Sequence, residues 1–432
     1  MARRRGARQR DGDRHGVGFC AQSAVAKVRT SEPQRAQGVI RFEIPEETLP
    51  EDHRARLLWQ IVAQLDLSAF LAEARAVEGQ QGRDQTSVRM LLTLWLYAIS
   101  VNVGSGREIE RRLKSDPAFQ WIVGDQRVGR TRLNEFRTSH PKALEKVFKD
   151  VLGVLMSKGL VSLDLVAQDG TRVRASASRP SFRGASSLAD CRQQAALHLR
   201  AVLAEADDND VRQQKVREAK ARDYQQRVDE AIDVVRELQK GSFGGKEPRG
   251  STTDAEARVM KMPGGGFHPA YNVQLATAGD PEGGPRTIVG VRVTNSGSDT
   301  GSIGPMIDDI ERNCGERPST LLADAGHASY ADINAAEERG VTALIAAQKR
   351  SLAHRDRRDD SATASWRERM RTDDAKQQMR ARAGLCELSN AHVKTRFAMA
   401  SLLVRGLTKV TCMVLLTALT ANLVAHAASL TS

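Results

Sequence analysis

The sequence is poor in cysteine, and its five cysteines are scattered without any Cys-x-x-Cys pair (Cys20, Cys191, Cys314, Cys386 and Cys412). This pattern excludes a small disulfide-stapled scaffold, argues against a thiolate metal site and indicates a reducing cytoplasm. Long apolar runs are scarce too, and the first 38 residues lack the apolar core of a signal peptide. Residues 410–432 are uncharged and mostly apolar, but polar residues interrupt them. We therefore expect a buried helix there rather than a membrane span, which needs about 20 strongly apolar residues.

The composition is that of a globular protein with an excess of basic residues. The chain has 432 residues, of which 40% are hydrophobic and 27% charged. At about 100–200 residues per domain, it is long enough for two to four domains. Half of the net charge of +12 lies in residues 1–38, which carry nine Lys or Arg and three Asp or Glu. Such a basic arm can bind nucleic-acid phosphates; a disordered tail, or a start codon assigned too early, are the alternatives.

Residues 39–158 are predicted to form a helical domain. Apolar residues recur at helical spacing over 57–65 and 88–99, and Pro141 opens a further helix. The connection between the short helices is rich in arginine (Arg127, Arg130, Arg132 and Arg137). Short helices with basic connections suit a DNA-binding module of helix-turn-helix type. A helical domain with an ordinary solvated surface is the alternative.

Strands and helices alternate after residue 159. We predict strands at 160–167, 270–277, 287–294, 320–323 and 341–346, with helices at 302–312 and 329–338 and a final helical region from 384. A charged helical insert interrupts this order at 183–250. Without the insert, the order is that of an α/β, ribonuclease-H-like mixed sheet flanked by helices. The predicted catalytic domain therefore comprises residues 159–182 and 251–428.

Three acidic residues are candidates for catalysis. Asp169 and Asp324 each follow a predicted buried strand, with a glycine within two residues, and carboxylates at strand ends point into the ligand crevice of an α/β sheet. Turn or helix-cap roles are the alternative for each. Glu387 lies on a predicted helix and shares a face with Asn390, Ala391 and Lys394. A solvated charged face is the alternative for that helix.

Carboxylates that converge in one crevice repel one another unless hard divalent cations lie between them. Carboxylate and water oxygens are the ligands that Mg²⁺ prefers. Two such ions (Mg²⁺ or Mn²⁺) can activate a water or a 3′-hydroxyl and stabilise the leaving oxygen of a phosphodiester. The basic character of the chain fits a polyanionic substrate of this kind.

Several short motifs, in this order, resemble bacterial insertion-sequence transposases of the DDE class, within the large IS-Five-like superfamily. The three catalytic blocks of that family are similar to Gln168–Thr171, Ala323–His327 and Arg382–Lys394. Further similarity lies in Leu91–Tyr97, Ser105–Glu110, Gly264–Gln274 and Val404–Leu407. In one departure, Met379 stands where related third blocks often have a tyrosine, which weakens any inference about stacking on a flipped base.

The resemblance implies a cytoplasmic, nucleoid-associated transposase that acts on double-stranded DNA as a homodimer, without a membrane. Such an enzyme binds its terminal inverted repeats, cleaves there and transfers the 3′-ends to target DNA. The resemblance implies Asp169, Asp324 and Glu387 as the metal-binding triad, and Lys394, Arg382 and Arg405 as DNA contacts. A transposase-derived DNA-binding protein without activity, or a ribonuclease-H-like nuclease without joining activity, are the alternatives.

Overall fold

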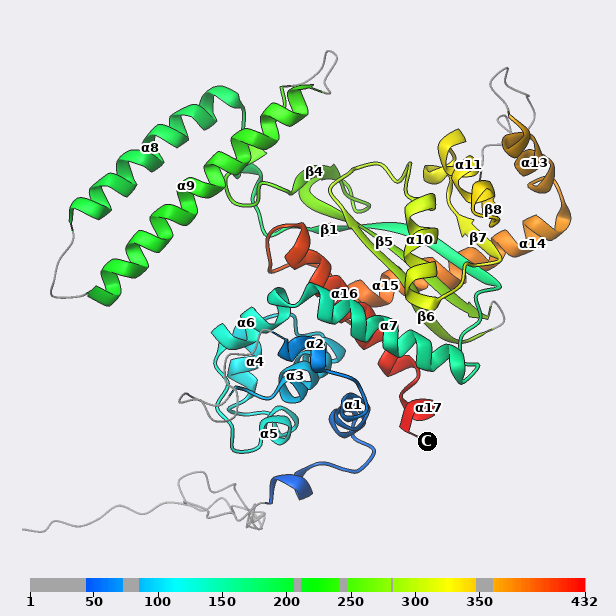
Figure 1. Ribbon diagram of the computed structural model, residues 1–432, viewed down its shortest axis with the longest axis horizontal. Coiled ribbons are helices and arrows are strands. Elements are labelled where there is room, and N and C mark those ends of the chain that lie inside the picture. The colour runs from blue at the N-terminus through cyan, green and yellow to red at the C-terminus, as the bar shows by residue number, and fades with distance from the viewer. Residues whose placement is uncertain are drawn as a thin grey trace, which may run out of the picture. The chain divides into compact units, whose positions relative to one another are not determined.

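The computed structural model describes residues 44–72, 85–205, 211–240, 247–280, 283–346 and 360–431. The basic arm predicted over residues 1–38 lies outside these residues. Residues 44–432 form one compact unit, which is shown in Figure 1.

The N-terminal part of this unit is helical, as predicted (Figure 1). Three of its helices begin with a side chain that accepts a hydrogen bond from a backbone N–H group, namely Ser87, Ser105 and Asp116. The first position of two helices is a proline, Pro117 or Pro141. The elements are η1 (Pro45–Thr48), α1 (Arg54–Ala63), α2 (Ser68–Leu71), α3 (Val88–Ser100), α4 (Gly106–Arg112), α5 (Pro117–Val123), α6 (Arg130–Ser139) and α7 (Pro141–Ser157). Helix α3 is buried on almost every side, and α1, α5 and α6 pack against it.

Arg137 was predicted to face DNA, and the structure places it in the core instead. Only 5% of the residue is exposed. Its guanidinium donates to the carbonyl of Gly104 at 2.8 Å and lies over the ring of Trp95, with 4.9 Å to the centroid. Burial lowers the pKa of Arg137 to about 10. The aliphatic stem and the aromatic partner make this arginine a packing residue, which charge counting along the sequence does not reveal.

A mixed β-sheet forms the second half of the unit. Its order is β4-β5-β1-β7-β8, and β6 also pairs with β5. The strands are β1 (Leu165–Arg174), β4 (Arg258–Lys261), β5 (Phe267–Asp280), β6 (Gly283–Thr294), β7 (Thr320–Ala323) and β8 (Thr342–Ile345). The pairs β1–β5 and β5–β6 are antiparallel, whereas β1–β7 and β7–β8 are parallel. The predicted α/β class is confirmed, and this order is consistent with the ribonuclease-H-like arrangement.

The first predicted strand was placed too early. Strand β1 begins at Leu165 and continues to Arg174, so Asp169 lies inside the strand and not beyond its end. An Asp-Gly pair usually signals a turn. Here Gly170 to Arg174 continue the antiparallel pairing with Ala270–Gln274 of β5. Tertiary pairing with a long neighbouring strand therefore outweighs the local turn preference.

Helices cover the sheet and connect it to the N-terminal part. The remaining elements are α10 (Ile303–Cys314), η4 (Ala325–His327), α11 (Tyr330–Glu338), α13 (Ser361–Arg369), α14 (Asp373–Arg382), the π-helix η5 (Ala383–Glu387), α15 (Leu388–Thr395), α16 (Leu407–Ala425) and α17 (Ala427–Thr431). Helix α16 packs against β6 on one side and against α3, α6 and α7 on the other. One continuous hydrophobic core therefore extends from the N-terminal helices to the sheet.

Helix α16 is the one described helix long and apolar enough to cross a membrane by length and composition. About two thirds of it is buried inside this unit, which identifies it as a core helix. Two polar residues near its C-terminal end have partners on β6. Asn422 accepts from the Ile288 N–H and donates to the Ile288 carbonyl, both at 2.8 Å, and His426 Nε2 lies 2.7 Å from Thr287 Oγ1.

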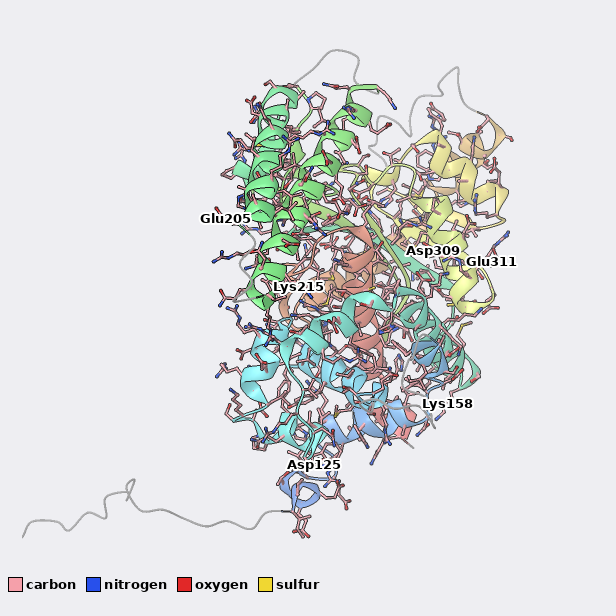
Figure 2. All side chains as sticks on the ribbon, turned by 60° about the vertical axis from the view of Figure 1, so that its left-hand side comes forward. Asp125, Lys158, Glu205, Lys215, Asp309 and Glu311 are labelled. Atoms are coloured by element: carbon pink, nitrogen blue, oxygen red, sulfur yellow. The ribbon has the colours of Figure 1, made fainter. Side chains whose placement is uncertain are left out.

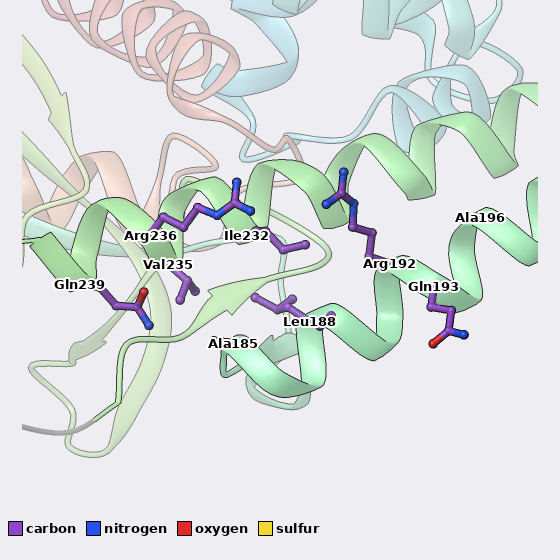
Figure 3. Close-up of a pocket in the computed structure, with 10 residues that line it drawn as sticks. Ala185, Leu188, Arg192, Gln193, Ala196, Ile232, Val235, Arg236 and Gln239 are labelled. Carbon is purple, nitrogen blue, oxygen red and sulfur yellow. The ribbon is translucent and has the colours of Figure 1, made fainter.

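The predicted helical insert is a hairpin of two long helices, α8 (Ala185–Ala204) and α9 (Val211–Lys240). It leaves the fold at a short antiparallel pair, β2 (Phe182–Arg183) with β3 (Gly250–Ser251), preceded by η2 (Arg179–Ser181). Glu205 and Lys215, labelled in Figure 2, flank the segment that joins the two helices. Near the base, Leu188 and Val235 belong to a small apolar cluster, beside a cavity of about 470 Å³ that Figure 3 shows between the helices.

Candidate active site

Two of the predicted acidic residues lie side by side on neighbouring parallel strands, Asp169 within β1 and Asp324 directly after the end of β7. Ala167 of β1 lies opposite Leu322 of β7, and Asp169 and Asp324 each lie two residues farther along. Because side chains alternate along a strand, the two carboxylates start from the same face of the sheet. The negative charge of Asp324 contributes to raising the pKa of Asp169, as expected for neighbouring acids.

Asp169 is half-buried, and Asn390 of α15 holds it. The Asn390 amide Nδ2 donates to Asp169 Oδ2 at 2.9 Å. Burial raises the pKa of Asp169 more than this hydrogen bond lowers it. Asp169 is therefore a carboxylate whose charge the protein alone stabilises poorly.

Asp324 has the opposite environment. Its Oδ1 accepts from the Gly326 N–H at 2.9 Å and lies 2.8 Å from Nδ1 of the fully buried His327. The hydrogen bond with His327 holds the pKa of Asp324 below its usual range. The protein thus maintains Asp324 as an anion and fixes its direction.

A polar network on the other face of β1 supports His327. The His327 Nε2 lies 3.3 Å from Gln274 Oε1, while Gln274 Nε2 donates to Asp299 Oδ1 at 2.6 Å. Asp299 therefore orients the Gln274 amide so that its oxygen faces His327. The network needs glycine at position 170, because a Cβ there would lie 2.3 Å from Asp299 Oδ1.

Glu387, the third predicted acid, lies at the end of the π-helix η5. Arg382 Nη2 pairs with Glu387 Oε1 at 2.7 Å, five residues away along the chain. A π-turn brings residues five apart onto one side, whereas an α-helix would separate them by about 140°. The positive charge of Arg382 also favours the ionised forms of Asp169 and Asp324, although burial, the largest effect on Asp169, raises the pKa of that residue.

The other predicted DNA-contacting residues are divided between two regions. Lys394 lies near Asp169. Burial lowers the pKa of Lys394, and the charge of Asp169 raises it by a smaller amount. Arg405 precedes α16, is exposed and donates from Nε to the carbonyl of Ser176 at 3.2 Å. Arg127, Arg130 and Arg132 lie in and just before α6, within the N-terminal helices, and the first two are exposed.

The two aspartates fit a divalent cation better than the glutamate does. Each of the three carboxylates keeps one oxygen (Asp169 Oδ1, Asp324 Oδ2, Glu387 Oε2) to which no described residue donates a hydrogen bond. A cation would also offset the poorly stabilised charge of Asp169. However, within the described part of the chain no three His, Cys, Asp or Glu side chains are grouped closely enough to hold a metal ion. Glu387 would have to exchange Arg382 for the ion.

The sequence did not identify the residues that orient these acids. From the sequence, His327 is either a turn residue or a residue that supports the site or contacts a phosphate, and the hydrogen bonds of Asn390 and Gln274 are not predicted. One signal was present: Asn272 and Gln274 alternate with Tyr271, Val273 and Leu275 in a strand that is otherwise apolar. Polar side chains at such positions are buried and need partners, which marks them as candidates for a network beneath a site.

Two protein-family models match the chain. The model described as "Transposase DDE domain" matches residues 242–423, and a second, described as a transposase domain, matches residues 43–139. Together they span nearly two thirds of the sequence. The first match includes Asp324 and Glu387 but not Asp169, which strand pairing places beside Asp324. No curated protein and no solved structure matches the chain.

Proposed function

This chain belongs to the DDE transposases, and from that premise we propose that it binds the terminal inverted repeats of an insertion sequence, cleaves the DNA there and transfers the 3′-ends to target DNA. The observation that carries the proposal is the placement of Asp169 in β1 and Asp324 directly after β7 at equivalent positions of adjacent strands, each held by a second side chain. Membership of the IS-Five-like group stays a prediction.

We assign Asp169 and Asp324 to hold the divalent ions, with Glu387 completing the set when its carboxylate leaves Arg382. Bound there, two Mg²⁺ or Mn²⁺ ions would supply activation of the attacking oxygen and neutralisation of the leaving oxygen. Asn390 and His327 orient the two aspartates through their hydrogen bonds. Arg382 balances the acidic charge until then, and once Glu387 is released it is free to bind a phosphate.

We assign DNA binding to two sets of basic residues. Lys394, Arg382 and Arg405 would contact phosphates near the cut, and Arg127, Arg130 and Arg132 would contact the repeat through the N-terminal helices. Two ends must be joined in one event, so a homodimer is the expected active form. Residues 39–158 would then be the DNA-binding domain, 159–182 and 251–428 the catalytic domain, and 183–250 an insert.

The proposal is tested by cleavage of a linear duplex that carries the inverted repeats flanking the gene. We expect Mg²⁺-dependent cutting at the repeat ends by the wild type. Asp169→Asn and Asp324→Asn should each lose at least about 10³-fold in rate, because several kcal/mol of transition-state stabilisation depend on the ions. Asp164→Asn, an exposed aspartate one residue before β1, is the matched control and should cut normally.

Equal cleavage by the wild type and Asp169→Asn would overturn the assignment. A second measurement separates the alternatives: with a 3′-hydroxyl end and target DNA supplied, a transposase gives joined product, whereas a nuclease gives only cut DNA. Thermal unfolding adds a readout without activity. An ion at 100 times its Kd stabilises the native state by about 2.7 kcal/mol, and this gain should be absent in Asp169→Asn.

A further inference from the structure

A second cavity lies on the opposite side of α15 from the acidic residues. At 100° per residue, Asn390 and Lys394 lie on the same side as Glu387, whereas Ser389, His392 and Arg396 lie on the other. That other side borders a cavity of about 390 Å³, closed by the start of β6 and the end of α16. The cavity is therefore separate from the proposed active site.

Basic side chains from three elements that are distant in the sequence line the cavity. Arg286 comes from β6, His392 from α15 and Arg396 from the residue after α15, and no described residue that lines the cavity is acidic. Arg286 Nε donates to the carbonyl of Gly384, which holds this guanidinium at the rim. No described residue accepts a hydrogen bond from the terminal nitrogens of Arg286, the His392 ring or the Arg396 guanidinium.

The two arginines lie close enough to the His392 ring for their charges to act on it. Burial lowers the pKa of His392 first, and the charges of Arg396 and Arg286 lower it further. The rest of the wall is mainly apolar, with Ile288 and Phe397 among its residues. A ligand that satisfies both parts of the cavity has an anionic group for the cations and a less polar group beside it.

We propose that this cavity binds a phosphate group between Arg286, His392 and Arg396, with the attached sugar or base against the apolar wall. Guanidinium groups suit phosphate because their N–H donors match two of its oxygens at once. The phosphate has two possible sources, a DNA strand or a free phosphate compound. The DNA source rests on the proposed function, whereas binding of a free phosphate does not.

Arg396→Gln tests the cavity because this side chain is exposed and supports no described side-chain contact. Lys220→Gln, an exposed cation on α9 that lies outside the cavity and outside the two domains assigned to DNA, is the matched control for the loss of one charge. Both variants should unfold at the wild-type temperature. In the first arm, affinity for a duplex of about 30 base pairs is measured from 50 to 200 mM salt. In the second arm, thermal unfolding is measured with inorganic phosphate or dAMP against chloride at equal ionic strength.

We expect Arg396→Gln to weaken duplex binding several-fold and to reduce the slope of log K against log salt by about one, while Lys220→Gln matches the wild type. That result identifies DNA as the source. If only the stabilisation by phosphate or dAMP depends on Arg396, the cavity takes a free phosphate compound. The proposal is overturned if Arg396→Gln and Lys220→Gln behave alike in both arms. Failure of the proposed function would appear separately, as unchanged cleavage by Asp169→Asn.

Discussion

At the scale of single residues, Asp169 and Asp324 are similar acids placed in opposite environments. Burial dominates around Asp169 and raises its pKa, while the hydrogen bond from His327 dominates around Asp324 and lowers its pKa. One carboxylate is thus costly to ionise and the other is stabilised as an anion. A pair of this kind favours capture of a cation by Asp169 next to an anion that is already formed and oriented.

In the absence of divalent ions, these two environments predict that removing the charge of Asp169 and removing the charge of Asp324 change the stability of the protein in opposite directions. The native state binds the Asp169 proton more tightly than the unfolded chain does, so its stability falls as pH rises between the unfolded and the native pKa. The native state binds the Asp324 proton less tightly than the unfolded chain does. The stability that ionised Asp324 contributes is therefore present above its pKa in the unfolded chain and is lost as pH falls through its pKa in the native state. At pH 7, Asp169→Asn should therefore stabilise the protein. Asp324→Asn should destabilise it by no more than about 1 kcal/mol, because solvent screens this partly exposed group.

Urea unfolding in EDTA, measured from pH 4 to pH 8, checks this prediction. The gain from Asp169→Asn should grow with pH and then level off, and Asp164→Asn should change little at any pH. A loss of stability in Asp169→Asn at pH 7 would contradict the assigned environment of this residue.

At the scale of elements, two local irregularities determine which residues meet. The π-helix η5 aligns Arg382 with Glu387, and it packs against β1 and β5. The pairing of β5 with β6 shifts register between Ala276 and Thr277, near Ile288. The backbone groups of Ile288 then find their partner in Asn422 of α16. Asn422, a polar residue in an apolar helix, thus forms hydrogen bonds with backbone groups of β6 that β5 does not bond.

Asn422→Ala is expected to lower the free energy of unfolding by about 2–4 kcal/mol, because two buried backbone groups lose their partner and each costs about 1–3 kcal/mol. Thr411→Ala on the same helix is the control, since Thr411 bonds only to the Leu407 carbonyl of its own helix, and it should cost well under 1 kcal/mol. Denaturant midpoints measure both. Equal midpoints for the two variants would show that α16 does not need this contact with β6.

At the scale of the whole molecule, the described unit combines a continuous core with one appended hairpin. Helix α16 joins the sheet to the N-terminal helices, whereas α8 and α9 pack mainly against each other and contact the rest near β3. The hairpin enters and leaves through adjacent backbone positions, since Arg183 pairs with Gly250. The core and the hairpin should therefore be separable.

Replacing residues 184–249 by Asn-Gly should leave a folded protein, because this pair closes an antiparallel strand pair by a tight turn. We expect one cooperative unfolding transition, with stability within about 2 kcal/mol of the full chain, since the small cluster at the hairpin base is lost. Circular dichroism should show a lower helix signal and near-ultraviolet bands that persist. Loss of cooperative unfolding would mean that the hairpin is part of the core.

Much of the fold was predictable from periodicity and turn chemistry. The helix capped by Ser329 and ended before Gly340, and the strand over 320–323, lie where the sequence predicted them. Asp169 was located by its motif, but its position inside β1 was not, because pairing with β5 continues the strand past an Asp-Gly turn signal. Arg137 was misassigned because a buried cation and an exposed one look alike in sequence.

The sequence by itself determined the α/β class and the three candidate acids, because composition, spacing and strand signals are local properties. Only the tertiary structure decided how those acids are held. Asn390 reaches Asp169 across more than 200 residues, and Asp299, through Gln274, sets the side of His327 that faces Asp324. The second cavity, beside α15, likewise forms only where β6, α15 and α16 meet. Such contacts depend on packing between distant segments, and no spacing rule along the chain encodes them.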